Sequence, residues 1–324
     1  MAWEMPGLSG TPLTIDSHAH INPPRWSQAA GAAIRPFDLD ALFREQDAAG
    51  VSLTVFGQPW FRRPPDRTPI DATREFNDFA VELTARHPDR LLGLAAANPF
   101  GGDPYLRELE RAITEGGLPG VLVNSSVEGE YLDSRRADDF WALVTRLDVP
   151  VFIHPPYQTI GNERMEMYRL PEMLGRPFDT TLTLARLILT GVLERYPTLN
   201  LVCAHLGGAI ALLPGRLNFG YELRHDQTFG PWEPDVLTKP PSEYIAQLYL
   251  DTMCLHMPAV MLLVATVGVD HVVFGSDHPP VPIPLERHTA VIHNLPLAHA
   301  DKAKILGLNL ARLLKLPVGS ASGE

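Results

Sequence analysis

The sequence predicts an α/β protein of the (β/α)8 barrel (TIM barrel) class. Short runs rich in Val, Leu and Ile alternate with longer amphipathic segments, a pattern that indicates repeated βα units and a parallel sheet. Eight such runs occur within 324 residues, and a barrel of this class typically needs about 250 residues. A doubly wound open sheet is the alternative that the same alternation allows.

The eight candidate strands are apolar along most of their length, as expected for a parallel sheet that is buried on both faces. In chain order they span residues 13–21, 51–59, 91–99, 120–126, 149–156, 199–208, 246–253 and 270–280.

Helical patterns lie between these runs. Two of them carry a clear apolar stripe, formed by Phe76, Phe79, Ala80 and Leu83 in the first and by Phe140, Leu143, Val144 and Leu147 in the second. The later segments "TLARLILTGVLERY", "AVMLLVATVG" and "DKAKILGLNLARLLK" are also predicted to be helical, and the last of them closes the fold.

We expect one barrel domain over residues 13–316, an N-terminal extension over 1–12 and a loose C-terminal tail over 317–324. Two segments are longer than a minimal barrel needs, namely 22–36 after the first strand and 155–178 after the fifth. Both leave the carboxyl ends of strands, where barrel enzymes build their active sites. Long loops of this kind are often lids.

The composition restricts the partners. A formal net charge of −11 argues against nucleic acid as a ligand. Arginine carries nearly all of the positive charge, because lysine occurs only at Lys239, Lys302, Lys304 and Lys315. Arginine suits bidentate binding of carboxylates, and an acidic protein that takes an anionic substrate would need such arginines close to its site.

The location is predicted to be cytoplasmic. Cys203 and Cys254 both lie in apolar runs, which is typical of a reduced intracellular protein rather than a disulfide scaffold. The start of the chain, "MAWEMPGLSG", has no signal-peptide pattern. The longest apolar runs are too short to cross a membrane.

Five metal-competent side chains follow predicted strands: His18 and His20 in "DSHAH", His154 in "FIHPP", His205 in "AHLGG" and Asp277 in "FGSDHP". On a strand, His18 and His20 point to the same face, and imidazole is a good ligand for zinc. One histidine at a strand end is more often structural, but the carboxyl ends of four barrel strands converge on one mouth. The joint pattern therefore predicts a metal site there. We treat the other histidines as structural, with His256 and His278 as exceptions to examine.

The same four motifs, in this order, resemble the amidohydrolase superfamily, and more closely the amidohydrolase-related branch that includes aminocarboxymuconate-semialdehyde decarboxylase. The likeness covers most of the chain and is strongest after residue 150. The resemblance implies that His18, His20, His154 and Asp277 bind one divalent metal, usually zinc. It also implies that His205 is the nearby acid/base residue. Many decarboxylases of this branch begin with Glu-x-His, whereas this chain has His-x-His.

A single metal per chain is expected. Superfamily members with two metals normally carry a carboxylated lysine on the fourth strand, and the corresponding run "GVLVNSS" contains no lysine. Three histidines and one aspartate suit zinc, with manganese or cobalt as the other choices. Asp277 could also accept a proton, so it is a candidate for catalysis as well as metal binding.

Arg216, in "LLPGR", matches an arginine that in the decarboxylase reaches the substrate of a neighbouring subunit. The resemblance therefore implies a homodimer and makes Arg216 the main candidate for substrate binding. The segment 57–65 matches no known substrate pattern. Further candidates for contacting the substrate are Arg35, Trp60, Arg62, Arg63 and Arg224.

The favoured function is non-hydrolytic decarboxylation of an unsaturated or aromatic carboxylic acid, in which the metal polarises the substrate while His205 and Asp277 handle the proton. The alternative is metal-dependent hydrolysis of a C–C, ester, lactone or amide bond, which would use the same residues. A non-catalytic metal-binding protein is a third hypothesis, although structural zinc sites are normally closed.

Overall fold

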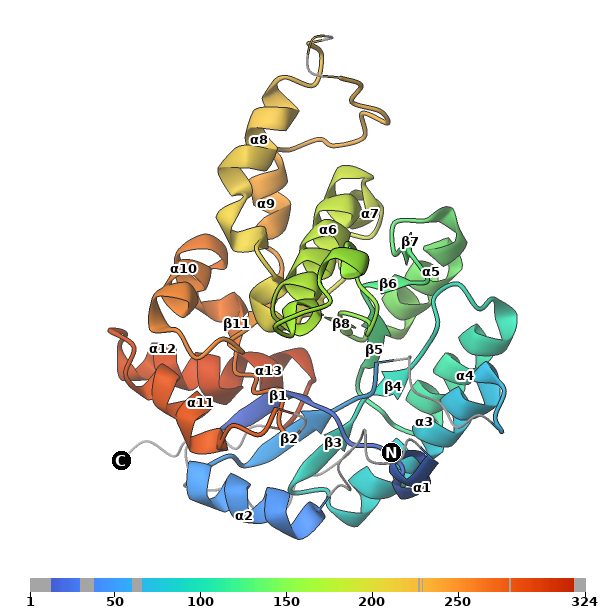
Figure 1. The fold of residues 1–324 in the computed structure, drawn as a ribbon, viewed down its shortest axis with the longest axis vertical. Coiled ribbons are helices and arrows are strands. Elements are labelled where there is room, and N and C mark those ends of the chain that lie inside the picture. The colour runs from blue at the N-terminus through green and yellow to red at the C-terminus, as the bar shows by residue number, and fades with distance from the viewer. Residues whose placement is uncertain are drawn as a thin grey trace.

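The computed structural model describes residues 13–29, 38–59, 66–226, 228, 230–279 and 281–317. In this part of the chain, parallel strands form a central barrel and the helices surround it (Figure 1). The predicted extension over 1–12 and all but one residue of the tail over 317–324 lie outside the described residues, so the division into extension, barrel and tail stays a prediction.

Each of the eight predicted runs contains a strand. In chain order these are β1 (Ile15–Ala19), β2 (Leu53–Phe56), β3 (Leu91–Gly93) with β4 (Ala95–Ala96), β5 (Val121–Asn124), β8 (Val151–His154), β9 (Leu201–Cys203), β10 (Tyr249–Asp251) and β11 (Val272–Val273). The strands β1, β2 and β3 pair in parallel, and so do β4, β5, β8, β9, β10 and β11 in that order. The Leu94 N–H donates to the Phe56 carbonyl oxygen over 2.8 Å at the bend between β3 and β4. A short antiparallel pair, β6 (Ser126–Val127) and β7 (Glu130–Tyr131), follows β5.

The barrel closes where β1 meets the segment that continues β11. The Ser17 N–H donates to the Phe274 carbonyl oxygen over 2.9 Å, and the Asp277 N–H donates to the His18 carbonyl oxygen over 2.8 Å. The buried Asp16 carboxylate accepts the His18 N–H and the N–H of the residue before Asp277, each over 3.0 Å. These bonds join the first strand to the last, so the barrel prediction is confirmed and the open sheet is wrong.

Helices follow the strands around the outside of the barrel. They are α1 (Pro24–Ala29), α2 (Leu39–Ala49), α3 (Pro69–Arg86), α4 (Asp103–Thr114), α5 (Asp138–Leu147), α6 (Arg176–Leu189), α7 (Val192–Arg195), α8 (Pro214–Glu222), α9 (Pro241–Ile245), α10 (Met257–Val267), α11 (Leu285–His293), α12 (His299–Ala303) and α13 (Asn309–Leu313). Single turns of 3₁₀ helix occur at Arg135–Ala137, Asn162–Arg164, His205–Gly207, Ile210–Leu212 and Val269–His271, and π-helical turns at Pro171–Gly175 and Lys304–Leu308.

The predicted stripes are the buried faces of α3 and α5. In α3, Phe76, Ala80 and Leu83 are fully buried and Phe79 is half-buried against the core. Thr68 begins this helix, because its hydroxyl accepts the Asp71 N–H. In α5 the buried residues of the predicted stripe are Phe140, Leu143 and Val144, and Leu147 is half-buried.

The long segment after β8 is anchored to the barrel by one buried carboxylate. Asp179, in the first turn of α6, accepts hydrogen bonds from Ser125 Oγ (2.5 Å), Ser126 Oγ (3.0 Å), Tyr131 OH (3.1 Å) and Ile160 N (3.1 Å). The segment 155–178 is therefore fixed at both ends. The other predicted excursion, 22–36, is described only as far as residue 29.

An arm built from α8 and α9 projects from the barrel (Figure 1). Asn218 on α8 and Ser242 on α9 hold the two helices together, since the Asn218 Nδ2 donates to Ser242 Oγ over 2.9 Å and the Ser242 N–H donates to Asn218 Oδ1 over 3.0 Å. No residue of α8 is fully buried. The apolar stripes of the sequence did not predict this arm, because a helix off the barrel needs no such stripe.

Two further expectations concern the cysteines and the membrane. Cys203 and Cys254 are both free thiols. Cys203 is buried in β9, whereas Cys254 is only half-buried because it lies in the turn after β10. Within the described ranges, no helix has the length and apolar character needed to cross a bilayer.

Candidate metal centre

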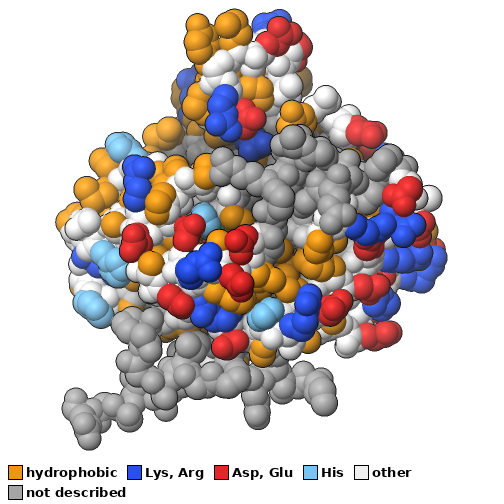
Figure 2. All heavy atoms as spheres, turned by 60° about the horizontal axis from the view of Figure 1, so that its bottom comes forward, with side chains coloured by type: hydrophobic (Ala, Val, Ile, Leu, Met, Phe, Trp, Pro, Cys, Tyr) orange, Lys and Arg blue, Asp and Glu red, His pale blue; other side chains and the backbone are white. Residues whose placement is uncertain are grey.

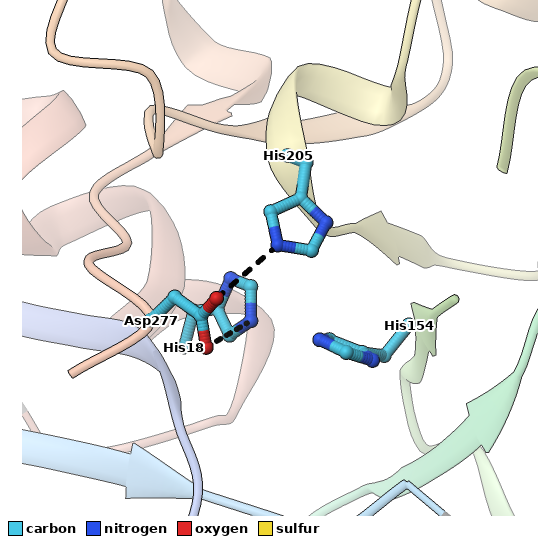
Figure 3. Close-up of side chains that lie close together, drawn as sticks. All are labelled: His18, His154, His205 and Asp277. Carbon is cyan, nitrogen blue, oxygen red and sulfur yellow. Dashed lines mark hydrogen bonds and ion pairs between the residues drawn. The ribbon is translucent and has the colours of Figure 1, made fainter. Parts of the chain in front are cut away.

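The five predicted side chains meet at the carboxyl ends of the strands. His18, His154, His205 and Asp277 each offer a ligand atom, and these atoms lie within 4.8 Å of one another (Figure 3). His20 lies beside them, with its Nε2 3.1 Å from His154 Nε2 and 3.2 Å from Asp277 Oδ1. The structure thus contains a His/Asp metal-binding group at the mouth of the barrel.

Asp277 lies at the centre of the cluster. Its Oδ1 is 3.6 Å from His18 Nε2 and 3.2 Å from His20 Nε2, and its Oδ2 is 3.4 Å from His205 Nε2. Figure 3 shows the His18 and His205 rings directed at this carboxylate from two sides. Three Nε2 atoms therefore surround one pair of carboxylate oxygens.

Three of the four histidines are held by their other ring nitrogen. The Nδ1 atom is within hydrogen-bond distance of an acceptor in each case: Asp251 Oδ2 for His18 (2.7 Å), the Gly57 carbonyl oxygen for His20 (3.0 Å) and the Pro155 carbonyl oxygen for His154 (2.8 Å). Because these oxygens accept hydrogen bonds, Nδ1 carries the proton and Nε2 keeps its lone pair. Metal-binding histidines usually have this arrangement.

His205 differs from the other three. Among the described residues its buried Nδ1 has no hydrogen-bond partner, and its ring faces an oxygen through Nε2 instead, 3.4 Å from Asp277 Oδ2. Its side chain is 12% exposed, against 5% for His18 and 9% for His20. Its ring centroid lies 5.2 Å from that of His154, as expected for the ends of the paired strands β8 and β9.

The residues fit a divalent cation. His18 Nε2 is buried and has no hydrogen-bond partner within the described part of the chain, which is unfavourable for a polar atom unless a further group binds it. Imidazole nitrogen and carboxylate oxygen are ligands that zinc, manganese and cobalt accept. A cation between His18 Nε2 and Asp277 would satisfy this atom.

The protonation states also suit a cation. Burial lowers the pKa of His18 and holds the pKa of His154 well below its ordinary value. Burial alone would raise the pKa of Asp277, but His18, His20 and His205 outweigh it and hold that pKa well below its usual range. Neutral imidazoles and an ionised carboxylate are the forms that bind metal.

The turn after β9 brings His205 close to α6. Residues 205–208 all have positive φ, from 53° to 69°. A Cβ at Gly208 would overlap the Pro177 carbonyl oxygen and the Thr181 hydroxyl, so the backbone approaches α6 as closely as only glycine permits.

Asp251 was not among the predicted site residues. It is 1% exposed, ends β10 and binds His18 Nδ1. Burial alone would raise the pKa of Asp251, but the hydrogen bond and charge of His18 outweigh it, so the pKa is lowered and the group is ionised. A polar residue at the carboxyl end of the seventh strand, in "YLDT", is the same signal that identified the other residues. The Gly57 and Pro155 carbonyl oxygens carry no such signal, because they belong to the backbone.

The predicted substrate contacts are only partly described. Arg216 is exposed on α8, and its guanidinium carbon lies 5.4 Å from the Phe219 ring centroid. Arg224 is 3.3 Å from Asp235 Oδ2 and packs on Tyr221, also in the arm. The remaining candidates, Arg35, Trp60, Arg62 and Arg63, lie outside the described residues.

This barrel and its metal-binding group place the chain in the class of metal-dependent (β/α)8 barrel proteins. The chain belongs to the amidohydrolase family, because the model of that family, described as Amidohydrolase, matches residues 15–316. The resemblance inferred from the four motifs is confirmed.

Its relatives include decarboxylases. The 2-amino-3-carboxymuconate-6-semialdehyde decarboxylase of Dictyostelium discoideum is 31% identical over 252 residues, which cover 75% of this chain and 67% of the relative. The gamma-resorcylate decarboxylase of Rhizobium radiobacter is 27% identical over 293 residues, covering 86% and 87%. A crystal structure of dihydroxybenzoic acid decarboxylase from Polaromonas sp. JS666, with bound manganese and the inhibitor 2-nitroresorcinol, has a similar fold, with a TM-score of 0.77 at 22% identity over 97% of this chain and 99% of that one.

Next to the cluster lie two more histidines. His278 follows Asp277, and its Nε2 is 3.5 Å from Glu45 Oε2. His288 on α11 is 3% exposed, and neither of its ring nitrogens has a hydrogen-bond partner within the described ranges. Burial, with the neighbouring His278 second, lowers the pKa of His288 to about 4.

We predict that His288 makes stability depend on pH. Its pKa is about 4 when folded and 6.5 when unfolded, so below pH 6.5 the unfolded chain binds the proton first and the free energy of unfolding falls as the pH drops towards 4. His288→Leu removes this group. The free energy of unfolding of the variant relative to wild type should therefore rise between pH 7.5 and 4.5, by up to about 1.4 kcal/mol per pH unit.

Urea unfolding at several pH values measures this difference, and contributions common to both proteins cancel. The control is His299→Leu, at an exposed side chain, for which the difference should change far less with pH. A flat difference for His288→Leu would contradict the prediction.

Proposed function

We propose that this protein is a metal-dependent, non-hydrolytic decarboxylase of an aromatic or unsaturated carboxylic acid. One observation carries the proposal. Three histidines with anchored Nδ1 atoms and one aspartate face a fourth histidine, His205, whose Nδ1 has no such anchor among the described residues and whose Nε2 faces Asp277. Two relatives of the chain are decarboxylases of a carboxymuconate semialdehyde and of gamma-resorcylate, which supports both the reaction and the type of substrate.

His18, His20, His154 and Asp277 would hold one divalent cation, with zinc as the expected metal and manganese or cobalt as the other choices. When bound, the cation supplies Lewis acidity that orients the substrate and draws electron density from it. The manganese in the Polaromonas decarboxylase supports a divalent metal in this fold.

His205 would supply the proton. In decarboxylation the bond between the reacting carbon and the carboxylate breaks, its electron pair stays on that carbon, a proton bonds there, and carbon dioxide leaves. A donor next to the reacting carbon is required. His205 is the most exposed of the four histidines in the cluster. Its Nε2 lies 3.4 Å from Asp277 Oδ2, so the ionised carboxylate can accept a hydrogen bond from the protonated ring.

Product analysis tests the reaction. A panel of hydroxybenzoates and unsaturated carboxylic acids should yield one equivalent of carbon dioxide per substrate consumed, with no oxygen from ¹⁸O-labelled water in the other product. Incorporation of one labelled oxygen without carbon dioxide would contradict decarboxylation and indicate the hydrolase.

We further propose that the active unit is a homodimer, in which Arg216 reaches the substrate of the partner. Apolar side chains are exposed on two neighbouring features. On the segment 155–178, Met167, Tyr168 and Met173 are each more than half exposed, and Leu212 and Phe219 are exposed at the arm. At the top of Figure 2, hydrophobic side chains are visible over the arm, with charged side chains of both signs among them. Exposed apolar surface of this kind is typical of association sites.

A cytoplasmic location is proposed on the sequence alone.

The roles of His205 and His154 can be separated by substitution. His205→Ala should retain about one divalent metal per chain but lose roughly 10²- to 10⁴-fold in turnover, because it removes a general acid. His154→Ala should lose both metal and turnover, because it removes a ligand. Elemental analysis, melting temperature and turnover are measured on both variants. Loss of the metal from His205→Ala would make His205 a ligand instead.

Arg216→Ala should raise KM for the carboxylate substrate by at least about tenfold, as expected for loss of a charge-assisted hydrogen bond. Arg216→Lys should restore little of it, because an ammonium group does not replace a planar guanidinium. The control is Arg107→Ala, at an exposed arginine on α4. Sedimentation of the wild type should show a dimer, and a fully active monomer would rule out the contact across subunits.

A further inference from the structure

Asp251 binds two parts of the site at once. Its carboxylate is buried at the end of β10, between β9 and β11. Oδ2 accepts from His18 Nδ1 over 2.7 Å. Oδ1 accepts the Leu206 N–H over 3.0 Å and the Met253 N–H over 3.2 Å. The two oxygens therefore have separate partners, one on a proposed metal ligand and the other on the turn that carries His205.

The bond to His18 sets the tautomer of that ring. Of the three acceptors that hold the ligand histidines, Asp251 is the side chain, while Gly57 and Pro155 contribute main-chain carbonyl oxygens. With Nδ1–H donated to Asp251, the lone pair of His18 lies on Nε2, the buried atom without a partner. Without an acceptor at Nδ1, the proton is free to sit on Nε2 and block it.

The bond to Leu206 holds a strained turn. Leu206 has φ 64° and ψ 12°, a left-handed conformation that leucine adopts only where its surroundings enforce it. The preceding residue, His205, also has positive φ. Because the Leu206 N–H donates to Asp251, the carboxylate helps fix the direction in which the His205 ring leaves the backbone.

We propose that Asp251 is a positioning residue that couples the metal site to the acid/base group, by fixing the His18 tautomer and the His205 turn through one carboxylate. This inference rests on the proposed function, since that assigns His18 as a ligand and His205 as the proton donor. Asp251 touches neither substrate nor cation in this role. It acts through the two histidines.

Asp251→Asn tests the proposal with little change in volume. If the amide oxygen keeps the Leu206 and Met253 bonds, its NH₂ faces His18 Nδ1 and the proton moves to Nε2. We expect this orientation because it preserves two bonds rather than one. The affinity for zinc, measured by competition with a chelator on the loaded protein, should then fall by about 10- to 100-fold. Because this variant keeps the bond to the Leu206 N–H, its kcat should recover when zinc is saturating. Asp251→Ala also removes the acceptor of the Leu206 N–H, so its kcat should stay reduced at saturating zinc while KM changes less than about twofold.

Asp251→Glu separates this role from packing. Asparagine is the better match in shape, and the site is tight, since a Cβ at Gly275 would lie 3.0 Å from the Asp251 Cβ. If Asp251 is needed only for packing, the Asp251→Asn variant should bind zinc more tightly than the Asp251→Glu variant. If Asp251 is needed as a hydrogen-bond acceptor, the Asp251→Glu variant should bind zinc more tightly, and this is the result that we expect.

The matched control is Asp179→Asn. Asp179 is equally buried at 1% exposure and accepts several hydrogen bonds, but from Ser125, Ser126 and Tyr131 rather than from a ligand histidine. It should leave zinc affinity within about twofold of wild type. Circular dichroism confirms that each variant is folded.

Three results would overturn the proposal. Unchanged zinc affinity in Asp251→Asn would remove the link to His18. Full recovery of kcat by Asp251→Ala at saturating zinc would remove the link to His205, and tighter zinc binding by the Asn variant than by the Glu variant would indicate packing alone. A wild-type protein that binds zinc but releases no carbon dioxide from any substrate would refute the proposed function, whereas the zinc measurements on Asp251 would still be decisive for the link to His18.

Discussion

The site depends on the seam where the first strand of the barrel bonds to the last. The Asp277 N–H donates to the His18 carbonyl oxygen, so residues almost the full chain length apart become neighbours. Asp16 reinforces the seam by accepting backbone N–H groups from both sides. Since parallel strands all direct their carboxyl ends to the same mouth, closure of this seam also sets the distances to His154 and His205. Contacts of such long sequence separation form late and slowly in folding, and the cluster is complete only when the barrel is.

Most of the fold and much of the cluster followed from the sequence, for the same physical reason. A strand buried on both faces has to be apolar, so a polar residue at its end is conspicuous. His154 and Asp277 were found in this way, and Asp251 satisfies the same rule at the end of β10. The anchors of His20 and His154 could not be found, because carbonyl oxygens are common to all residues. The arm of α8 and α9 was missed because α8 has no buried face to pattern its sequence.

Identical imidazoles acquire different chemistry from what their Nδ1 atoms meet. An acceptor at Nδ1 leaves the lone pair of His18, His20 and His154 on Nε2, the form that our proposal assigns to a cation. Among the described residues the Nδ1 of His205 has no such acceptor, and our proposal assigns this ring to the proton. The positive φ values of residues 205–208 contribute to this difference between His205 and the other histidines. They turn the backbone at His205 away from the strand direction, whereas His154 is still part of its strand. A barrel of this class supports many reactions, and the family alone does not fix the substrate. The contacts of each histidine ring restrict the possible reactions more than the fold does.

The use of main-chain oxygens as anchors has a consequence for inheritance. A substitution at position 155 alters the side chain but leaves the carbonyl oxygen in place. The same holds at position 57, where an added Cβ would lie 2.8 Å from the Leu122 side chain. Substitution at position 57 is therefore limited by space rather than by loss of the acceptor. At position 251 the acceptor itself is encoded by the side chain. Natural substitutions at positions 57 and 155 can therefore keep the hydrogen bonds of His20 and His154. A single nucleotide substitution that changes Asp251 to Asn removes the acceptor of His18. Among homologous sequences, the identity of this one residue should separate chains that hold a metal tightly from those that hold it about 10- to 100-fold more weakly.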